Sequence, residues 1–230
     1  MTTQADAGAE RAPRERPRHR LRADDGRLVR GRRSRDRIQR AARELFREHG
    51  FDGTTLRAIA SRAGMGASSI YRHVRSKEEL LVSELVALQE EAWQRFRAAD
   101  DRRAPTQERV AHFLEIQHEL FAADRDFTLI ALRATTRPQA RVARQVLALH
   151  DRTIGLLAEI LQMGRMQRDL DREIDVLEAA RTLFHITQGA RIPWVNGLVS
   201  ADASLASIRT GVELLFRGIG RRPPGDAPAR

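Results

Sequence analysis

Several hydrogen-bonding side chains lie close together near residue 70, and their chemistry suits contact with DNA. The stretch SSIYRH, residues 68–73, offers hydroxyl, guanidinium and imidazole groups and contains no acidic residue. Arg72 can form two parallel hydrogen bonds with a guanine, and Ala67 can meet a thymine methyl group. The hydroxyl of Tyr71 suits phosphate oxygens, which position a protein without specifying sequence. These residue types in one run indicate a DNA-reading surface.

The residues around this run predict two short helices. Apolar residues recur with helical spacing in the first, at Leu56, Ile59, Ala60 and Ala63. A threonine pair, residues 54–55, can cap this helix, and Gly64 can take the left-handed conformation that ends it. The second helix begins after Gly66 and has Ile70 and Val74 on its inner face. Two short helices joined by a glycine-containing turn form a helix-turn-helix.

Two further helices frame this motif. Ser34 can cap a helix that ends at Gly50, and its apolar stripe is Ile38, Ala41, Ala42, Leu45 and Phe46. The sequence Ser76-Lys77-Glu78-Glu79 reads as a capping box that starts a long helix. We therefore expect an N-terminal three-helix DNA-binding domain over residues 34–80.

Linked motifs within residues 34–80 carry a family resemblance. The chain reads GFDGTTL, then IA..AGM, then IYRHV.SKEEL, and this combination resembles the DNA-binding domain of TetR-family transcriptional repressors. The resemblance implies that the base-facing residues are Ala67, Ser68, Ser69, Arg72 and His73. It also implies phosphate contacts from Thr55, Tyr71 and Lys77. Gly66 and Ser68 depart from the usual pattern, in which a Ser or Thr cap and a Gly are common; neither change undermines the fold.

Alternatives remain open for several of these residues. Arg37 is the best phosphate candidate in the first helix because it lies near the N-terminus, whereas most of that helix's other arginines are expected to face solvent. Tyr71 can instead pack against the first helix. Lys77 is the single lysine beside 40 arginines, which is mildly informative about geometry at this position.

The positive charge of the chain is concentrated in its first third. The formal net charge of the 230 residues is +10. Residues 1–35 carry 11 Arg and 5 acidic residues, and residues 36–77 carry 9 Lys or Arg and 4 acidic residues, whereas residues 78–230 are nearly neutral. This distribution is the electrostatic footprint of phosphate binding. Residues 1–33 contain few large apolar side chains, so we expect a disordered Arg-rich arm, and residues 221–230 a disordered tail.

The role of the arm is open at this point. It can enter a minor groove, as homeodomain arms do, or it can add only non-specific electrostatic attraction. The chain contains no cysteine, no apolar run of about 18 residues and no secretory signal. We therefore expect a cytoplasmic protein with no membrane partner.

Residues 81–220 predict a larger helical domain for effector binding and dimerisation, so the expected fold class is all-α. A helical bundle with aromatic side chains can enclose a small molecule. The candidate pocket residues are Trp93, Phe113, Gln117, Phe121, Phe127, His185 and Trp194. Ordinary core packing is an equally good interpretation of each. If a pocket exists, we expect an elongated, largely apolar effector.

The last helix predicts a dimer seam. Its apolar residues Leu205, Ile208, Val212, Leu215 and Ile219 are spaced 3, 4, 3 and 4 apart. Burial within the same subunit is the alternative. The TetR resemblance implies a homodimer formed through the last two helices, and hence a palindromic double-stranded DNA operator.

The functional hypotheses that follow belong to different classes. The first is a homodimeric, ligand-released transcriptional repressor. The alternatives are a non-specific architectural nucleic-acid-binding protein and a small-molecule-binding protein with a vestigial helix-turn-helix. The seven His residues show no zinc-like spacing, and no catalytic or phosphate-cradling motif is present. We therefore expect no metal, no cofactor and no enzymatic activity.

Overall fold

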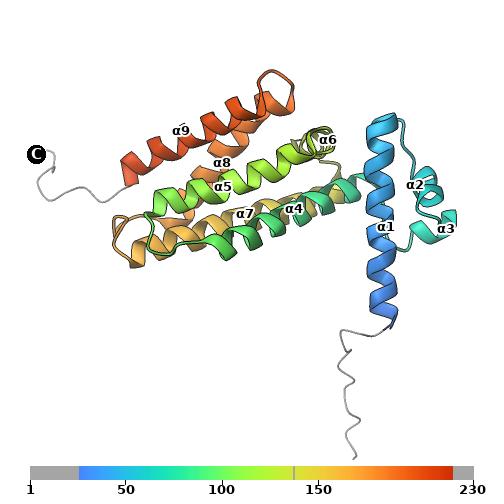
Figure 1. Ribbon diagram of the computed structural model, residues 1–230, viewed down its shortest axis with the longest axis horizontal. Helices are drawn as coiled ribbons and strands as arrows, with labels where there is room; N and C mark the ends of the chain where they lie inside the picture. Colours follow the sequence, from blue (N-terminus) through green and yellow to red (C-terminus); the bar gives the residue numbers. More distant parts are fainter. Residues whose placement is uncertain (1–25, 137, 220–230) are drawn as a thin grey trace, which may run out of the picture. The chain divides into compact units, whose positions relative to one another are not determined.

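A computed structural model describes residues 26–136 and 138–219, and all the regular structure within these ranges is helical (Figure 1). The helices are α1 (Gly26–His49), α2 (Leu56–Arg62), α3 (Ala67–Ile70), α4 (Lys77–Ala99), α5 (Thr106–Ala123), α6 (Arg125–Thr136), α7 (Ala140–Met166), α8 (Val176–Val195) and α9 (Ala201–Ile219). The predicted all-α fold class is confirmed.

Helix α1 begins eight residues earlier than the sequence predicts. It starts at Gly26 instead of Ser34, so residues 26–33 are helical and the predicted disordered arm is too long. The correction has a simple reason: no proline follows Pro17 before the end of α1, and arginine is a good helix former. The rest of the predicted arm, residues 1–25, and the predicted tail, residues 221–230, lie outside the described residues. The chain divides into two units between Asp36 and Arg37.

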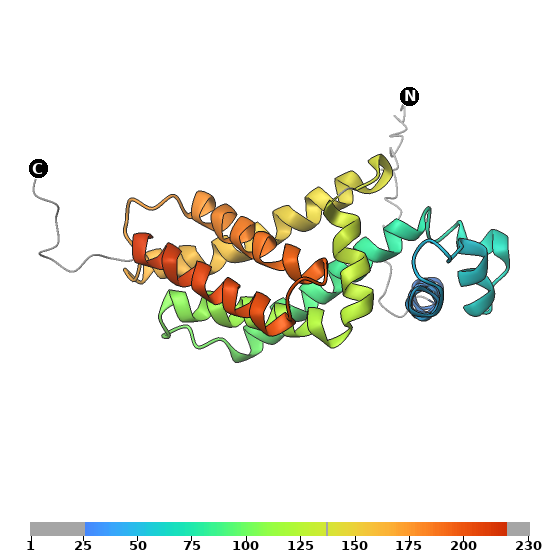
Figure 2. The ribbon, with the colours of Figure 1, turned by 90° about the horizontal axis from the view of Figure 1, so that it is seen from above.

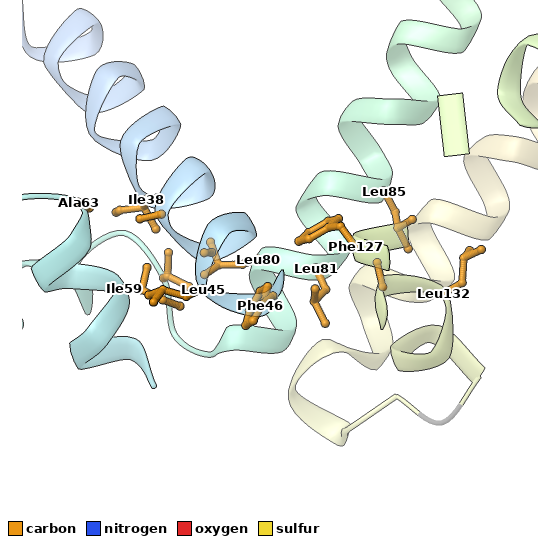
Figure 3. Close-up of a cluster of buried hydrophobic side chains, with 14 of the residues drawn as sticks. Ile38, Leu45, Phe46, Ile59, Ala63, Leu80, Leu81, Leu85, Phe127 and Leu132 are labelled. Atoms are coloured by element: carbon orange, nitrogen blue, oxygen red, sulfur yellow. The ribbon is translucent and has the colours of Figure 1, made fainter. Parts of the chain in front are cut away.

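The first part of the second unit, residues 37–80, packs as a small helical head. The predicted inner faces are buried: Ile38 and Phe46 of α1, Ile59 of α2 and Ile70 of α3 are each no more than 1% exposed. Figure 3 shows Ile38, Phe46 and Ile59 on the side of Leu80 at the start of α4, and Ile70 and Leu81 belong to the same buried cluster. Three-helix packing fixes the orientation of α3 even though α3 itself is only four residues long.

Residues 81–219 form the helical body. Helices α4, α5, α7, α8 and α9 lie lengthwise beside one another, and α6 runs across their direction (Figure 2). Their shared core includes Phe96, Phe113, Leu157 and Leu183. A buried ion pair closes one end of the bundle, where Arg109 donates two 2.8 Å hydrogen bonds to Asp100.

The predicted dimer seam on α9 needs correction, because its central residues are buried inside their own chain. Ile208 and Val212 are 1% and 2% exposed and belong to the body core, and Leu215 packs against the same core. A 3–4 spacing marks a buried helix stripe but does not say which chain covers it. Leu205 is half-buried, and the side chain of Ile219 lies outside the described residues.

Candidate DNA-binding surface and effector cavity

The helix-turn-helix is built from local caps and one left-handed glycine. Thr55 caps α2, because its hydroxyl oxygen accepts a hydrogen bond from the Ala58 amide at 3.1 Å. Gly64 has φ +65°, which a residue with a side chain rarely adopts, and it turns the chain after α2. Gly66 is the N-cap of α3. These are the positions at which the sequence predicts the two caps and the turn.

The predicted base-facing residues lie on α3 and the turn that follows it, away from the head core. Ala67, Ser68 and Arg72 are exposed, while Ser69 and His73 are partly exposed. Arg72 donates a 3.0 Å hydrogen bond from Nη2 to the Ser69 hydroxyl, so this guanidinium is held beside α3. The structure therefore places all five residues on one short solvent-facing segment, residues 67–73, which contains no acidic residue.

Three of the predicted phosphate contacts are also at the surface. Arg37 and Thr55 are exposed, and Tyr71 is 55% exposed, so packing against α1 does not bury this ring. Arg37 borders a shallow hollow between α1 and α2 together with Arg40 and Arg62. Arg62 pairs there with Glu44 and Glu48. Arg37 and Arg40 have no acidic partner among residues 26–136 and 138–219, so this hollow retains positive charge.

Lys77, the fourth predicted phosphate contact, is engaged inside the head. Its ammonium donates hydrogen bonds to the carbonyls of Phe51 at 2.5 Å, Thr54 at 3.1 Å and Asp52 at 3.5 Å. It also lies 4.3 Å from the centroid of the Phe51 ring. An ammonium has three N–H donors, and all three have partners here. Lys77 thus ties the start of α4 to the loop between α1 and α2.

Paired charges and aromatic rings join the head to the body. Arg43 of α1 pairs with Glu84 of α4, and Arg47 of α1 pairs with Asp124 beside α6. The ring of Phe46 lies 6.1 Å from that of Phe127, a predicted pocket residue. Figure 3 shows Phe127 near α4 and the end of α1. Phe127 is therefore part of the joint between head and body.

One half of the predicted capping box forms at the α4 N-terminus, at Ser76, whereas the Glu79 carboxylate bonds the amide one residue before the cap instead of the Ser76 amide. The Ser76 hydroxyl accepts a 3.2 Å hydrogen bond from the Glu79 amide, and the Glu79 carboxylate reaches back to accept one from the Arg75 amide at 2.8 Å. The start of α4 is thereby fixed to the end of the α3 turn.

The body contains two adjoining hollows between α4, α5, α6, α7 and α8. The inner cavity has a volume of about 30 Å³, and its walls include Gln89, Gln117, Phe121, His150, Phe184 and Arg191. The outer hollow, of about 110 Å³, opens beside Arg133, Ile192 and Asn196. Arg191 borders both hollows, together with Leu132, Thr135 and Gln188. Of the predicted pocket residues, Gln117 and Phe121 line the inner cavity.

The other predicted pocket residues lie elsewhere. Trp93 and Phe113 pack edge to face in the body core, with ring centroids 5.6 Å apart. Trp194 is completely buried against the imidazole of His118, and the side chain of His185 is exposed. For Trp93, Phe113 and Trp194, core packing is the correct interpretation. Aromatic content alone does not show which buried face borders a void.

Arg191 is the cavity residue that sequence reasoning missed. It is 5% exposed, its Nη2 donates a 2.7 Å hydrogen bond to Gln117 Oε1, and its guanidinium carbon lies 4.8 Å from the centroid of the Phe121 ring. Burial lowers the pKa of Arg191 to about 9. A signal was available, because Arg191 continues the buried stripe of α8 four residues after Thr187 and three before Trp194.

Two further observations concern membrane-spanning helices and metal sites within the described residues. No helix in residues 26–136 and 138–219 combines the length and apolarity that crossing a bilayer requires. In the same ranges, no three His, Asp or Glu side chains are placed to hold a metal ion together.

Comparisons with known proteins agree with this geometry. Residues 38–83 match the family model for bacterial regulatory proteins of the tetR family. The chain is 26% identical over 186 residues to the HTH-type transcriptional regulator UidR of Escherichia coli, covering 81% of this chain and 92% of that protein. It is 27% identical to Thermus thermophilus FadR, a TetR-family transcriptional repressor solved with lauroyl-CoA, with a TM-score of 0.66 and coverage of 85% and 98%.

A second solved structure shows the same fold at lower identity. Bacillus subtilis FadR, a transcriptional regulator solved with stearoyl-CoA, is 22% identical and has a TM-score of 0.65. The alignment covers 80% of this chain and 98% of that chain. The likeness thus extends from the head through the body.

Proposed function

This chain belongs to the TetR family of transcriptional regulators, and we propose that it is a homodimeric, cytoplasmic repressor released from a palindromic operator by a small-molecule effector. The observation that carries the proposal is an exposed segment without acidic residues, residues 67–73, followed closely by helix α4, which also lines a cavity. The segment at α3 binds DNA, and a ligand in the cavity changes the DNA affinity through α4.

Sequence recognition is assigned to α3 and the turn after it. Arg72 supplies a guanidinium that can bind a guanine edge, and the Ser68 and Ser69 hydroxyls can bind either base of a pair. Arg37, Thr55 and Tyr71 lie at the surface and supply phosphate contacts that fix the register of the protein on DNA. Lys77 supports the α1–α2 loop from inside, so its contribution to DNA binding is indirect.

Helix α4 connects the cavity to the head. Leu85 and Gln89 of α4 line the inner cavity, while Leu81, one turn before Leu85, and the adjacent Glu84 contact the head. Any ligand that widens the cavity therefore pushes on the helix that carries the head. The ligand must favour the DNA-incompetent arrangement, because only differential affinity shifts an equilibrium.

An apolar effector that opens the cavity fits this scheme. The hollows measure about 30 and 110 Å³, which is below the roughly 300 Å³ of a usual ligand pocket. A long acyl group, such as those bound by the two FadR proteins, would have to move the walls apart. Binding energy would then be coupled directly to movement of α4.

The homodimer is assigned to the outer faces of α8 and α9. Leu177 and Ile192 of α8 and Leu214 of α9 are large apolar side chains that are between 47% and 60% exposed. These replace Ile208 and Val212 as the proposed contact residues. Two copies would present two α3 helices, so operator half-sites should be related by two-fold symmetry.

Selection of bound sequences from a random duplex library tests the proposal. We expect palindromic enrichment, and binding to the selected duplex should survive excess random DNA. Adding decanoyl-CoA or another acyl effector should weaken that binding. Binding that collapses in random competitor would instead identify an architectural DNA-coating protein. Effector binding without any change in DNA affinity would identify a small-molecule-binding protein with a vestigial head.

A further inference from the structure

The cavity wall contains buried nitrogen atoms that lack hydrogen-bond partners. Nε of Arg191, Nε2 of Gln89 and Nε2 of His150 are inaccessible to water and have no acceptor or donor within reach among the described residues. All three residues line the same inner cavity, although they come from α8, α4 and α7. Burial of a polar group without a partner is costly, so three such groups in one cavity wall favour a ligand that carries a hydrogen-bonding group.

The charge of the cavity has one sign. Among the described residues that line either hollow, none is Asp or Glu, while Arg191 lies in both walls. No carboxylate forms an ion pair with Arg191 within residues 26–136 and 138–219. Its neighbours are the Gln117 amide oxygen and the face of the Phe121 ring, both of which orient the guanidinium without neutralising it. Gln117 occupies one edge of the guanidinium and leaves Nε unpartnered.

Arg191 remains a cation under physiological conditions. Burial lowers its pKa to about 9, which is still above neutral pH. Arg191 therefore carries a positive charge that has no anionic partner among the described residues, although only 5% of the residue is exposed. A buried charge of this kind is stabilised strongly by an anion of the right geometry, because the local dielectric constant is low.

We propose that the effector is an amphipathic organic anion whose carboxylate binds Nε of Arg191, with its apolar part against Phe121, Leu149 and Phe184. This proposal rests on the proposed ligand-released regulator and specifies the chemistry of its effector. Gln89 Nε2 and His150 Nε2 are unpartnered in the same cavity wall, and we assign them as further donors to the bound anion. Because Arg191 borders both hollows, the carboxylate lies at their junction.

The first experiment compares ligands on the unmodified full-length chain. Calorimetric titration at pH 7 uses decanoate, 1-decanol and decanoyl-CoA, which share an apolar chain and differ in head group. We expect decanoate to bind about 10- to 100-fold more tightly than 1-decanol, as for a lost hydrogen bond to a charged group. Equal binding of the acid and the alcohol, or no binding of decanoate at millimolar concentration, overturns the proposal.

The comparison of decanoate with decanoyl-CoA distinguishes recognition of a carboxylate from recognition of a thioester. If decanoyl-CoA binds and decanoate does not, the polar partner in the cavity is a neutral thioester carbonyl, and the proposed free carboxylate is wrong. If decanoate binds at least as tightly as decanoyl-CoA, the free acid carries the recognised group. This comparison needs no substitution, so it does not depend on whether a variant folds.

Matched variants assign the anion contact to one residue. Arg191→Met should abolish the preference for decanoate over 1-decanol, and Arg191→Lys, which keeps the charge, should retain part of it. Arg181→Met is the control, because Arg181 lies on the same helix with its side chain 51% exposed and outside both cavity walls. It should bind as the unmodified chain does. A full preference in Arg191→Met would overturn the assignment.

DNA binding provides the separate readout for the regulator itself. Decanoate that binds through Arg191 but leaves operator affinity unchanged would support the anion site and remove the proposed coupling. Decanoate that weakens operator binding in the unmodified chain but not in Arg191→Met would support both.

Discussion

The head (residues 37–80) and the body (residues 81–219) both bury apolar side chains but bring them together across very different separations in sequence. In the head, Ile38, Ile59 and Ile70 meet within about thirty residues of chain. In the body, the cavity wall combines Gln89, Gln117, His150 and Arg191, which span about a hundred residues. Local caps and turns therefore position the DNA-facing residues, whereas the packing of five helices positions the cavity.

This difference means that local backbone contacts fix the DNA-binding site, whereas the packing of helices fixes the shape of the cavity. The head is held by Thr55, Gly64 and Ser76, each of which satisfies or turns backbone within a few residues. The cavity has unpartnered polar atoms and small volumes, so it is the part of the molecule that a ligand can rearrange. The joint between the two regions is where that rearrangement must be transmitted.

Among the substitutions that distinguish head from body, truncation of Phe127 should change the free energy of unfolding the most. Phe127→Ala removes a buried ring from the joint, and we expect the free energy of unfolding to fall by about 3–5 kcal/mol in urea titrations. Phe113→Ala removes a completely buried ring from the body core and should cost a similar amount. The two variants should differ in function, because Phe127 contacts Phe46 of the head and Phe113 does not.

Operator affinity and its response to effector distinguish the two phenylalanines. At a temperature where both variants are folded, Phe127→Ala should weaken the effect of ligand on DNA binding, while Phe113→Ala should leave that coupling intact. Equal loss of coupling in both would mean that the joint has no special role and that overall body stability sets the response.

Removal of the guanidinium of Arg72 should have the next largest effect, on DNA binding alone. Arg72→Ala should cost about 1–3 kcal/mol at the selected operator and relax base preference at one position in each half-site. Gel-shift titration against a panel of single-base operator variants measures both quantities. Arg97→Ala is the control, since Arg97 is exposed at the far end of α4. Uniform weakening across all sequences would reassign Arg72 to phosphate.

Helix existence and the caps of the head follow from sequence because their physical causes are local. Thr55, Gly64 and Ser76 each act within four residues of the chain. The cavity could not be predicted in this way. An apolar stripe predicts that a face is buried, but whether it meets a void, as for Phe121, or solid core, as for Phe113, depends on distant helices.

Substitution of Lys77 should have a smaller effect on stability. It tests two roles, because the sequence suggests a phosphate contact and the structure shows contacts with backbone carbonyls. Lys77→Met removes the ammonium from three backbone carbonyls, and we expect unfolding stability to fall by about 1.5 kcal/mol. The slope of log affinity against log salt should stay unchanged. Arg37→Ala is the comparison, because an exposed phosphate contact should reduce that slope by about one with little loss of stability. A reduced slope in Lys77→Met would restore the phosphate role.

The smallest expected effect concerns the pH dependence of the body. His118 is buried against Trp194, and its Nε2 donates to the Ala201 carbonyl at 2.9 Å. Burial and then the charge of Arg191 lower the pKa of His118, while the Ala201 contact and Asp202 oppose the shift. The unfolded chain therefore binds a proton more readily than the folded one. Stability is fully present above the ordinary histidine pKa of about 6.5 and falls as pH drops below it.

His118→Gln tests this sign, because glutamine can still donate to the Ala201 carbonyl but does not titrate. Urea unfolding between pH 7.5 and pH 5 should show a shallower loss of stability in the variant than in the unmodified chain. His150 shares the direction of the shift, since burial also lowers its pKa, so the double variant with His150→Gln should be shallower still. An unchanged slope in both variants would place the acid sensitivity elsewhere, and the local stability of the head would then be the first place to look.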